Sequence, residues 1–131
     1  MKLGFIGTGK ITSAVITGIC SSSIPYNKII ISQRNKSISS TLKKKFNKIT
    51  INNDNQDIIN NSDWIFLSIT PTVGKKIIKN LKFKSNQTII SFISTIALAE
   101  LKKMINTKVN IVRAIPLPPI SLKGFLPCSQ K

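Results

Sequence analysis

The chain has 131 residues, the usual size of one domain, and 41% of them are hydrophobic, which suffices for a folded core without metals or disulfides. Its 20 basic residues stand against four acidic ones and no histidine, which gives a formal net charge of +16. This inventory lacks the bases and ligands of hydrolytic and metal-assisted catalysis, so we expect neither chemistry and no metal site.

Strand and helix signals alternate along the first half of the chain. The apolar spacing predicts strands at residues 3–6, 28–32 and 49–51, with helices between them marked by Ile11 to Ile19 and by Ile38, Leu42 and Phe46. Three consecutive isoleucines, Ile29 to Ile31, are typical of a strand that is buried on both faces.

The second half continues the alternation. It predicts strands at residues 64–69, 88–93 and 109–112, a short turn of helix through Ile58 and Ile59, a helix that begins at Pro71, and a helix marked by Leu98, Leu101 and Ile105. Asn53 and Asp54 precede the short turn and are suited to cap it, because a side-chain oxygen there accepts an orphan backbone N–H. The order of elements predicts an α/β fold: a doubly wound, mostly parallel six-stranded sheet with helices on both faces.

A glycine-rich stretch joins the first strand to the first helix. It reads Gly7-Thr8-Gly9-Lys10-Ile11, and we assign all five residues to the binding of cofactor phosphates. Gly7 permits a tight turn, Gly9 lets a pyrophosphate approach the backbone, and the helix N-terminus supplies free N–H groups. An ordinary glycine-rich turn is the alternative, but the preceding strand and the following helix favour a Rossmann-type dinucleotide fingerprint.

The residues after the second predicted strand indicate which dinucleotide is bound. An NAD site usually has an Asp or Glu about twenty residues beyond the glycine motif, whereas this chain has Ser32-Gln33-Arg34-Asn35. A guanidinium and small polar side chains bind a 2′-phosphate that a carboxylate would repel. We therefore predict NADP (NADPH) as the cofactor, with Ser32, Arg34 and Asn35 at the 2′-phosphate. An ordinary exposed arginine after a strand is the alternative.

Several motifs, in order, resemble the amino-terminal domain of the pyrroline-5-carboxylate reductases. They are Gly4-Phe5-Ile6-Gly7-Thr8-Gly9, Asp54-Asn55, Phe66-Leu67-Ser68-Ile69-Thr70-Pro71, Ser91-Phe92-Ile93 and Val112-Arg113-Ala114-Ile115-Pro116. The likeness runs from residue 1 to about Pro119. It implies an oxidoreductase of proline biosynthesis that reduces a small cyclic imine with NADPH.

The resemblance also implies further site residues. Asn55 would contact the adenosine ribose, Ser68, Ile69, Thr70 and Pro71 would border the cofactor, and Ile93 and Ser94 would lie near the nicotinamide. The resemblance gives no catalytic residue. Thr12, at the third glycine position, is larger than the usual Gly or Ala and should hold its helix slightly farther from the strand. Thr70 replaces a common lysine, which leaves the identity of the imine open.

The resemblance bears on domain organisation as well. We expect residues 1–115 to form the dinucleotide-binding domain and residues 116–131, which hold Pro116, Pro118, Pro119 and Pro127, to form a proline-rich tail. The family's second domain, a helical bundle that forms the dimer and much of the imine pocket, is not in the sequence. We therefore expect a truncated enzyme with poor activity alone and a dimer or higher oligomer in a full-length form. A non-catalytic dinucleotide-binding module is the alternative.

Charge and cysteine content limit the expected location and partners of the protein. Lysines are spread along the whole chain, and the dense run Lys43 to Lys45 belongs on the wet face of a helix. With no recognition motif beside this charge, we do not expect nucleic acid as a partner. Cys20 and Cys128 are too few for a disulfide framework. A reducing cytoplasm is therefore the expected location. No apolar run approaches the roughly 18 residues of a membrane span, so we expect no membrane partner.

Overall fold

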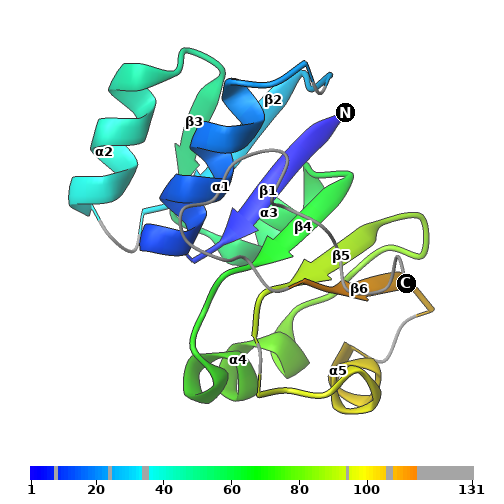
Figure 1. The fold of residues 1–131 in the computed structure, drawn as a ribbon. Coiled ribbons are helices and arrows are strands. Elements are labelled where there is room, and N and C mark those ends of the chain that lie inside the picture. The colour runs from blue at the N-terminus through cyan, green and yellow to red at the C-terminus, as the bar shows by residue number, and fades with distance from the viewer. Residues whose placement is uncertain (8, 24, 34–35, 94, 106–107, 115–131) are drawn as a thin grey trace.

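The computed structural model describes residues 1–7, 9–23, 25–33, 36–93, 95–105 and 108–114, and it shows one sheet of six strands (Figure 1). The strands are β1 (Lys2–Ile6), β2 (Lys28–Ser32), β3 (Ile49–Asn52), β4 (Trp64–Leu67), β5 (Thr88–Ser91) and β6 (Asn110–Arg113). The helices are α1 (Lys10–Cys20), α2 (Lys36–Lys45), α3 (Asn55–Asn60), α4 (Pro71–Ile77), the 3-10 turn η1 (Ile78–Asn80) and α5 (Leu98–Ile105).

The strand order is β3-β2-β1-β4-β5-β6, and every pair of neighbouring strands is parallel. The predicted fold class is therefore confirmed. The predicted ends of two strands are wrong by two residues, since β4 ends at Leu67 and β5 at Ser91. One more inter-strand hydrogen bond forms just beyond the end of each strand. After β4, the Ser68 N–H donates to the Ile6 carbonyl, and after β5, the Phe92 N–H donates to the Leu67 carbonyl. The chain then leaves the sheet.

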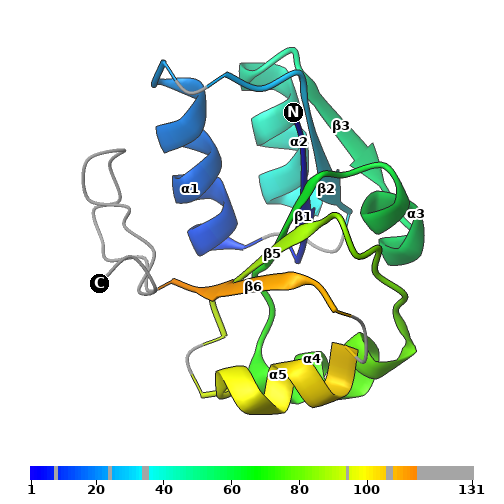
Figure 2. The same cartoon turned by 90° about the vertical axis from the view of Figure 1, so that its right-hand side faces the viewer.

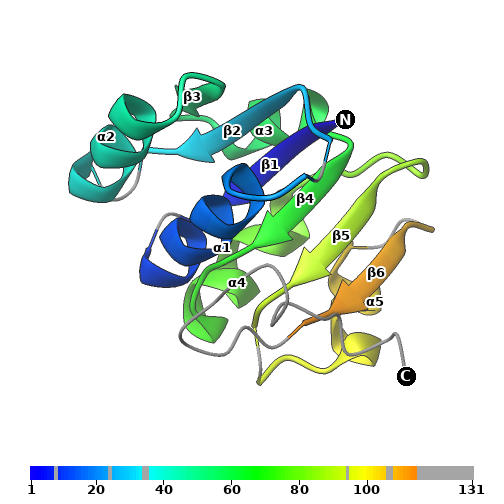
Figure 3. The ribbon, with the colours of Figure 1, turned by 45° about the horizontal axis from the view of Figure 1, so that its top comes forward.

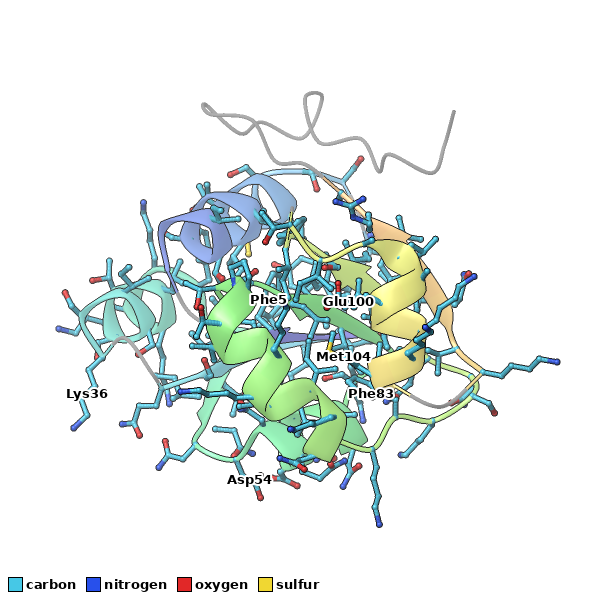
Figure 4. All side chains as sticks on the ribbon, turned by 90° about the horizontal axis from the view of Figure 1, so that it is seen from below. Phe5, Lys36, Asp54, Phe83, Glu100 and Met104 are labelled. Atoms are coloured by element: carbon cyan, nitrogen blue, oxygen red, sulfur yellow. The ribbon has the colours of Figure 1, made fainter. Side chains whose placement is uncertain are left out.

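Helices cover both faces of the sheet (Figure 2). Side chains of a strand alternate between the two faces, so Leu3 and Phe5 of β1 pack with α1 and α2, whereas Ile6 packs with α3, α4 and α5. The rings of Phe5 and Phe66 stack with centroids 4.4 Å apart. Phe5 lies in the interior of the molecule, while Lys36 and Asp54 lie at its periphery (Figure 4).

Local signals explain where the shorter helices begin. Asp54 is the N-cap of α3, and its carboxylate accepts a hydrogen bond of 3.0 Å from the Gln56 N–H. Thr70 is the N-cap of α4, and Pro71 follows it in the first turn, where the missing N–H of proline is not needed. The sequence-based prediction of both helix starts is confirmed.

The topology places a crevice between β1 and β4. From β1 the chain proceeds outward through β2 and β3, then crosses back to β4 and continues outward on the other side through β5 and β6 (Figure 3). In a doubly wound sheet, ligands bind off the carboxyl ends of the strands at this reversal of strand order. We call this side of the sheet the carboxyl edge, and the side where the strands begin the amino edge.

None of the described helices is long and apolar enough to cross a membrane. The predicted proline-rich tail, residues 116–131, lies outside the described residues, so the predicted domain boundary stays a prediction.

Candidate functional site

The turn after β1 can be built only with glycine. Gly7 has a φ of 96°, in the left-handed region that other L-residues rarely adopt. A Cβ at this position would overlap the carbonyl oxygen of Ser68 and the Ile69 side chain. The predicted role of Gly7 in a tight turn is thereby confirmed, and the turn lies directly at the crevice between β1 and β4.

Gly9 leaves the N-terminus of α1 open. It is the N-cap residue, its backbone is extended, and it has no side chain to cap the first turn. The first N–H groups of a helix have no intrahelical acceptor, and they carry a partial positive charge. A Cβ built on Gly9 would meet no heavy atom within 4 Å. The helix start therefore presents donors to open space, which suits an anionic group.

Two hydroxyl groups are bonded to the backbone of Gly7. The Thr12 hydroxyl donates to the Gly7 carbonyl at 2.9 Å, and the Gly7 N–H donates to the Ser32 hydroxyl oxygen at 3.2 Å. Thr12 is fully buried and Ser32 is 5% exposed. The larger residue at the third position of the glycine motif is thus accommodated with its polar atom paired.

A first hollow of about 290 Å³ lies on the β2 and β3 side of this turn. Its lining is Ile6, Gly7, Ser32, Gln33, Asn53, Asn55, Ile69 and Ile77. Three amide side chains give it polar groups, and three isoleucines give it apolar surface. It suits a ligand that combines a flat apolar body with hydrogen-bonding edges.

A second hollow of about 360 Å³ lies on the other side of the turn. Its lining is Gly9, Ile11, Thr12, Ser68, Ile69, Thr70 and Phe92. Ile69 belongs to both hollows, so they adjoin across the glycine turn. The Ser68 hydroxyl is buried and has no hydrogen-bond partner within the described part of the chain. A buried hydroxyl without a partner is costly, and a ligand in this hollow would relieve that cost.

The described residues that line the two hollows include no charged side chain, so no carboxylate there would repel an anion. The described residues also contain no group of three or more His, Cys, Asp or Glu side chains that could hold a metal ion.

Most of the predicted site residues that the structure describes gather at these two hollows. Gly7, Ser32, Asn55 and Ile69 line the first, and Gly9, Ile11, Ser68, Ile69 and Thr70 line the second. Pro71 lies in the first turn of α4 and belongs to neither lining. Ile93 is 2% exposed and packs in the core near Gly74, so its side chain also lines neither hollow.

Several predicted residues lie outside what the structure describes. They are Thr8, Arg34, Asn35 and Ser94, together with the side chain of Lys10, whose backbone begins α1. Their roles stay predictions.

The predicted site residues omit six that line the hollows: Ile6, Thr12, Gln33, Asn53, Ile77 and Phe92. Asn53 follows β3 directly and Phe92 follows β5 directly, so the rule that ligands sit off the carboxyl ends of strands pointed to both. Asn53 was interpreted only as a helix cap, and Thr12 only as a departure from the glycine motif.

Comparison with known proteins agrees with this geometry. The family described as "NADP oxidoreductase coenzyme F420-dependent" matches residues 2–95. Among curated relatives, pyrroline-5-carboxylate reductase 3 of Danio rerio is 28% identical over 130 residues, which is 96% of this chain and 44% of that protein. The chain thus spans less than half the length of this relative.

Solved structures give the same result. The 1-pyrroline-5-carboxylate reductase of Streptococcus pyogenes is 32% identical, with a TM-score of 0.74 over 88% of this chain and 42% of that one. The pyrroline carboxylate reductase of Plasmodium falciparum, solved with NADP bound, is 23% identical, with a TM-score of 0.75 over 91% of this chain and 43% of that one. The second likeness, at this identity, supports the fold alone.

Proposed function

Because the chain belongs to the NADP oxidoreductase coenzyme F420-dependent family, we propose that it holds NADPH at the carboxyl edge of its sheet. The observation that carries the proposal is the pair of adjoining hollows on either side of the Gly7 turn, with the open start of α1 between them. The description of that family, an NADP oxidoreductase, supports the same cofactor.

The residues present fit a dinucleotide. The first hollow, with its amide side chains Gln33, Asn53 and Asn55, would take the adenosine half, and the first turn of α1 would hold the pyrophosphate. The second hollow, with Phe92, Ile11 and the unpaired Ser68 hydroxyl, would take the nicotinamide half. Arg34 and Asn35, which follow β2 after Gln33 in the sequence, would bind the 2′-phosphate.

We further propose that the protein serves the reduction of a cyclic imine, pyrroline-5-carboxylate, in proline biosynthesis. The relatives named above carry that activity in their names. Bound NADPH supplies the hydride, so the protein's part is to bind and orient it and to keep water from the apolar second hollow. Mixing the chain with NADPH and pyrroline-5-carboxylate, while following the loss of absorbance of the reduced cofactor, tests this step. A homodimer and a cytoplasmic location stay predictions.

The cofactor assignment is tested by comparing NADPH with NADH on Arg34→Ala. A hydrogen bond to a charged group contributes about 1.5–3 kcal/mol, so the variant should bind NADPH about tenfold to a hundredfold more weakly. NADH affinity should stay within about twofold, because NADH has no 2′-phosphate for Arg34 to bind. Titration calorimetry on wild type and variant gives both constants, and an equal loss for the two cofactors contradicts the assignment.

A further inference from the structure

The two hydroxyl groups on Gly7 come from separate elements and bond to both of its backbone polar groups. Thr12 belongs to the first turn of α1, and Ser32 is the last residue of β2. The Thr12 hydroxyl lies 2.9 Å from the Gly7 carbonyl oxygen, and the Ser32 hydroxyl oxygen lies 3.2 Å from the Gly7 nitrogen. Gly7 is therefore linked to the helix that follows it and to the neighbouring strand.

The bond made by Thr12 differs from those of the other helical threonines. Thr17 and Thr41 donate to the carbonyl four residues earlier in their own helices, at 2.8 and 2.9 Å. Thr12 donates five residues back, to a carbonyl outside the helix. Because Thr12 is fully buried where α1 meets β1, its hydroxyl needs a partner there. The bond joins the start of α1 to the turn that sets its direction.

Ser32, like Thr12, is buried and hydrogen-bonded to the backbone of Gly7. It is 5% exposed, and its oxygen accepts the N–H of a residue held at a φ of 96°. Without such an acceptor, the N–H of Gly7 would be buried and unpaired, and the turn could relax to another conformation.

We propose that Thr12 and Ser32 are positioning residues that fix the Gly7 turn, and that Ser32 acts on the cofactor through Gly7 and not on its 2′-phosphate. The inference rests on the proposed binding of NADPH at this turn. The sequence predicted that Ser32 contacts the 2′-phosphate, which only NADPH carries. A role in fixing the Gly7 turn would instead affect NADPH and NADH alike, since both carry the pyrophosphate that the turn would receive.

The first experiment compares Thr12→Val, which keeps the shape and loses the hydroxyl, with Thr12→Ser, which keeps the hydroxyl. On the whole 131-residue chain, Thr12→Val should weaken both NADPH and NADH by about tenfold, and Thr12→Ser should stay within about threefold of wild type. Thr17→Val, which loses a helix-internal bond away from the turn, is the matched control and should leave both affinities unchanged. Thr12→Val binding like wild type overturns the proposal.

The second experiment separates positioning from direct phosphate contact. Ser32→Ala should weaken NADPH and NADH by the same factor, about fivefold to tenfold. A loss confined to NADPH overturns the proposal and returns Ser32 to the 2′-phosphate. Arg34→Ala, measured in the same series, shows what a loss of affinity confined to NADPH looks like.

A third measurement does not depend on cofactor binding. In the free chain, amide hydrogen exchange at Gly7 should be about tenfold faster in Ser32→Ala than in wild type, while exchange at Phe5 in the centre of β1 should not change. Unchanged exchange at Gly7 overturns the proposal even if the chain binds no dinucleotide. Failure of wild type to bind either cofactor would instead contradict the proposed function.

Discussion

The two edges of the sheet differ in how completely their buried polar groups are paired. At the amino edge, Gln87 is 3% exposed and its amide nitrogen donates to the carbonyls of Ile59 at 2.6 Å and Ser62 at 2.8 Å. Its amide oxygen accepts the N–H of Lys84 at 2.8 Å. At the carboxyl edge, the Ser68 hydroxyl is buried and unpaired within the described residues, and Gly9 leaves α1 without a side-chain cap.

The presence of a hollow alone would not distinguish these edges. The amino edge also has a polar hollow, of about 160 Å³, between Lys2 and Lys84. Gln87 is the buried amide side chain in its lining, and both its amide nitrogen and its amide oxygen are hydrogen-bonded within the protein. Because pairing of this kind stabilises the folded chain, the amino edge is built for stability, and the unpaired groups of the carboxyl edge are available to a ligand.

The largest effect on this comparison should come from Gly9→Val. The side chain would occupy the space at the start of α1 that the pyrophosphate needs, so binding of NADPH should fall by more than about a hundredfold. Since a Cβ at Gly9 meets no protein atom and the backbone φ of −140° is open to valine, the domain should still fold. Loss of a glycine N-cap should cost about 1 kcal/mol at most.

Circular dichroism and cofactor titration on the same preparation check the Gly9 prediction together. Gly9→Ala, with a smaller side chain, should weaken binding less than the valine variant. Tight NADPH binding by a folded Gly9→Val variant would mean that the phosphates bind elsewhere.

At the amino edge the expected effect is on stability. Gln87→Leu would leave the Lys84 N–H and the Ser62 carbonyl without this partner, and the Ile59 carbonyl would keep only the Ser62 N–H, so the free energy of unfolding should fall by about 3 kcal/mol. Affinity for NADPH, measured well below the unfolding transition, should stay within about twofold.

Gln56 offers a matched control for Gln87. Its amide makes the same kind of bonds, donating to the Lys82 carbonyl at 2.8 Å and accepting the Lys82 N–H at 2.8 Å, but it is only half-buried. Gln56→Leu should therefore cost less than about 1 kcal/mol in urea denaturation, because water can replace the lost bonds. Equal losses for the two variants would contradict the assignment of the amino edge to stability.

The sequence predicted the sheet, its six strands and the glycine turn, because those depend on local spacing: apolar residues, turn glycines and caps. It did not predict the two bonds of the Gln87 amide nitrogen, which join residues 28 and 25 positions apart. It also did not predict that Thr12 would bond to Gly7, because a bond of this kind is decided by how closely α1 packs on β1. Ile93 was expected near the nicotinamide; its side chain packs in the core, and its place beside the cofactor stays a prediction.

Two serines at the carboxyl ends of adjacent strands allow a finer test. Ser68→Ala removes a hydroxyl that has no partner within the described chain, so stability should stay the same or rise by up to about 1 kcal/mol. NADPH affinity should fall by about threefold to tenfold, since a bound ligand would use that hydroxyl. Thermal unfolding and titration calorimetry measure the two quantities.

Ser91→Ala is the counterpart of Ser68→Ala. Ser91 is 1% exposed, and its hydroxyl oxygen accepts the Ile93 N–H at 3.2 Å. Its loss should lower the free energy of unfolding by about 1 kcal/mol and leave NADPH affinity unchanged. A drop in stability for Ser68→Ala as large as that for Ser91→Ala would show that Ser68 serves the fold.

The smallest effect concerns the far end of α1, where Tyr26 meets Cys20. The Tyr26 hydroxyl donates to the Cys20 sulfur at 3.2 Å, and this bond, with burial and the charge interaction with Cys20, raises the pKa of Tyr26 from 10.0 to about 12. The folded chain thus favours the neutral phenol. Its contribution to stability is complete below pH 10 and is lost as the pH rises through about 12.

The chain contains one tyrosine, so the near-ultraviolet absorbance of tyrosinate reports Tyr26 alone. Cys20→Ala should move this titration down toward pH 10, because the largest cause of the raised pKa is removed. NADPH affinity at neutral pH should not change, since Gly9 and the turn proposed to bind the phosphates lie at the opposite end of α1. A Cys20→Ala variant that still titrates near pH 12 would mean that burial, and not the bond to Cys20, holds the proton on Tyr26. A variant that loses NADPH affinity would mean that the two ends of α1 are coupled.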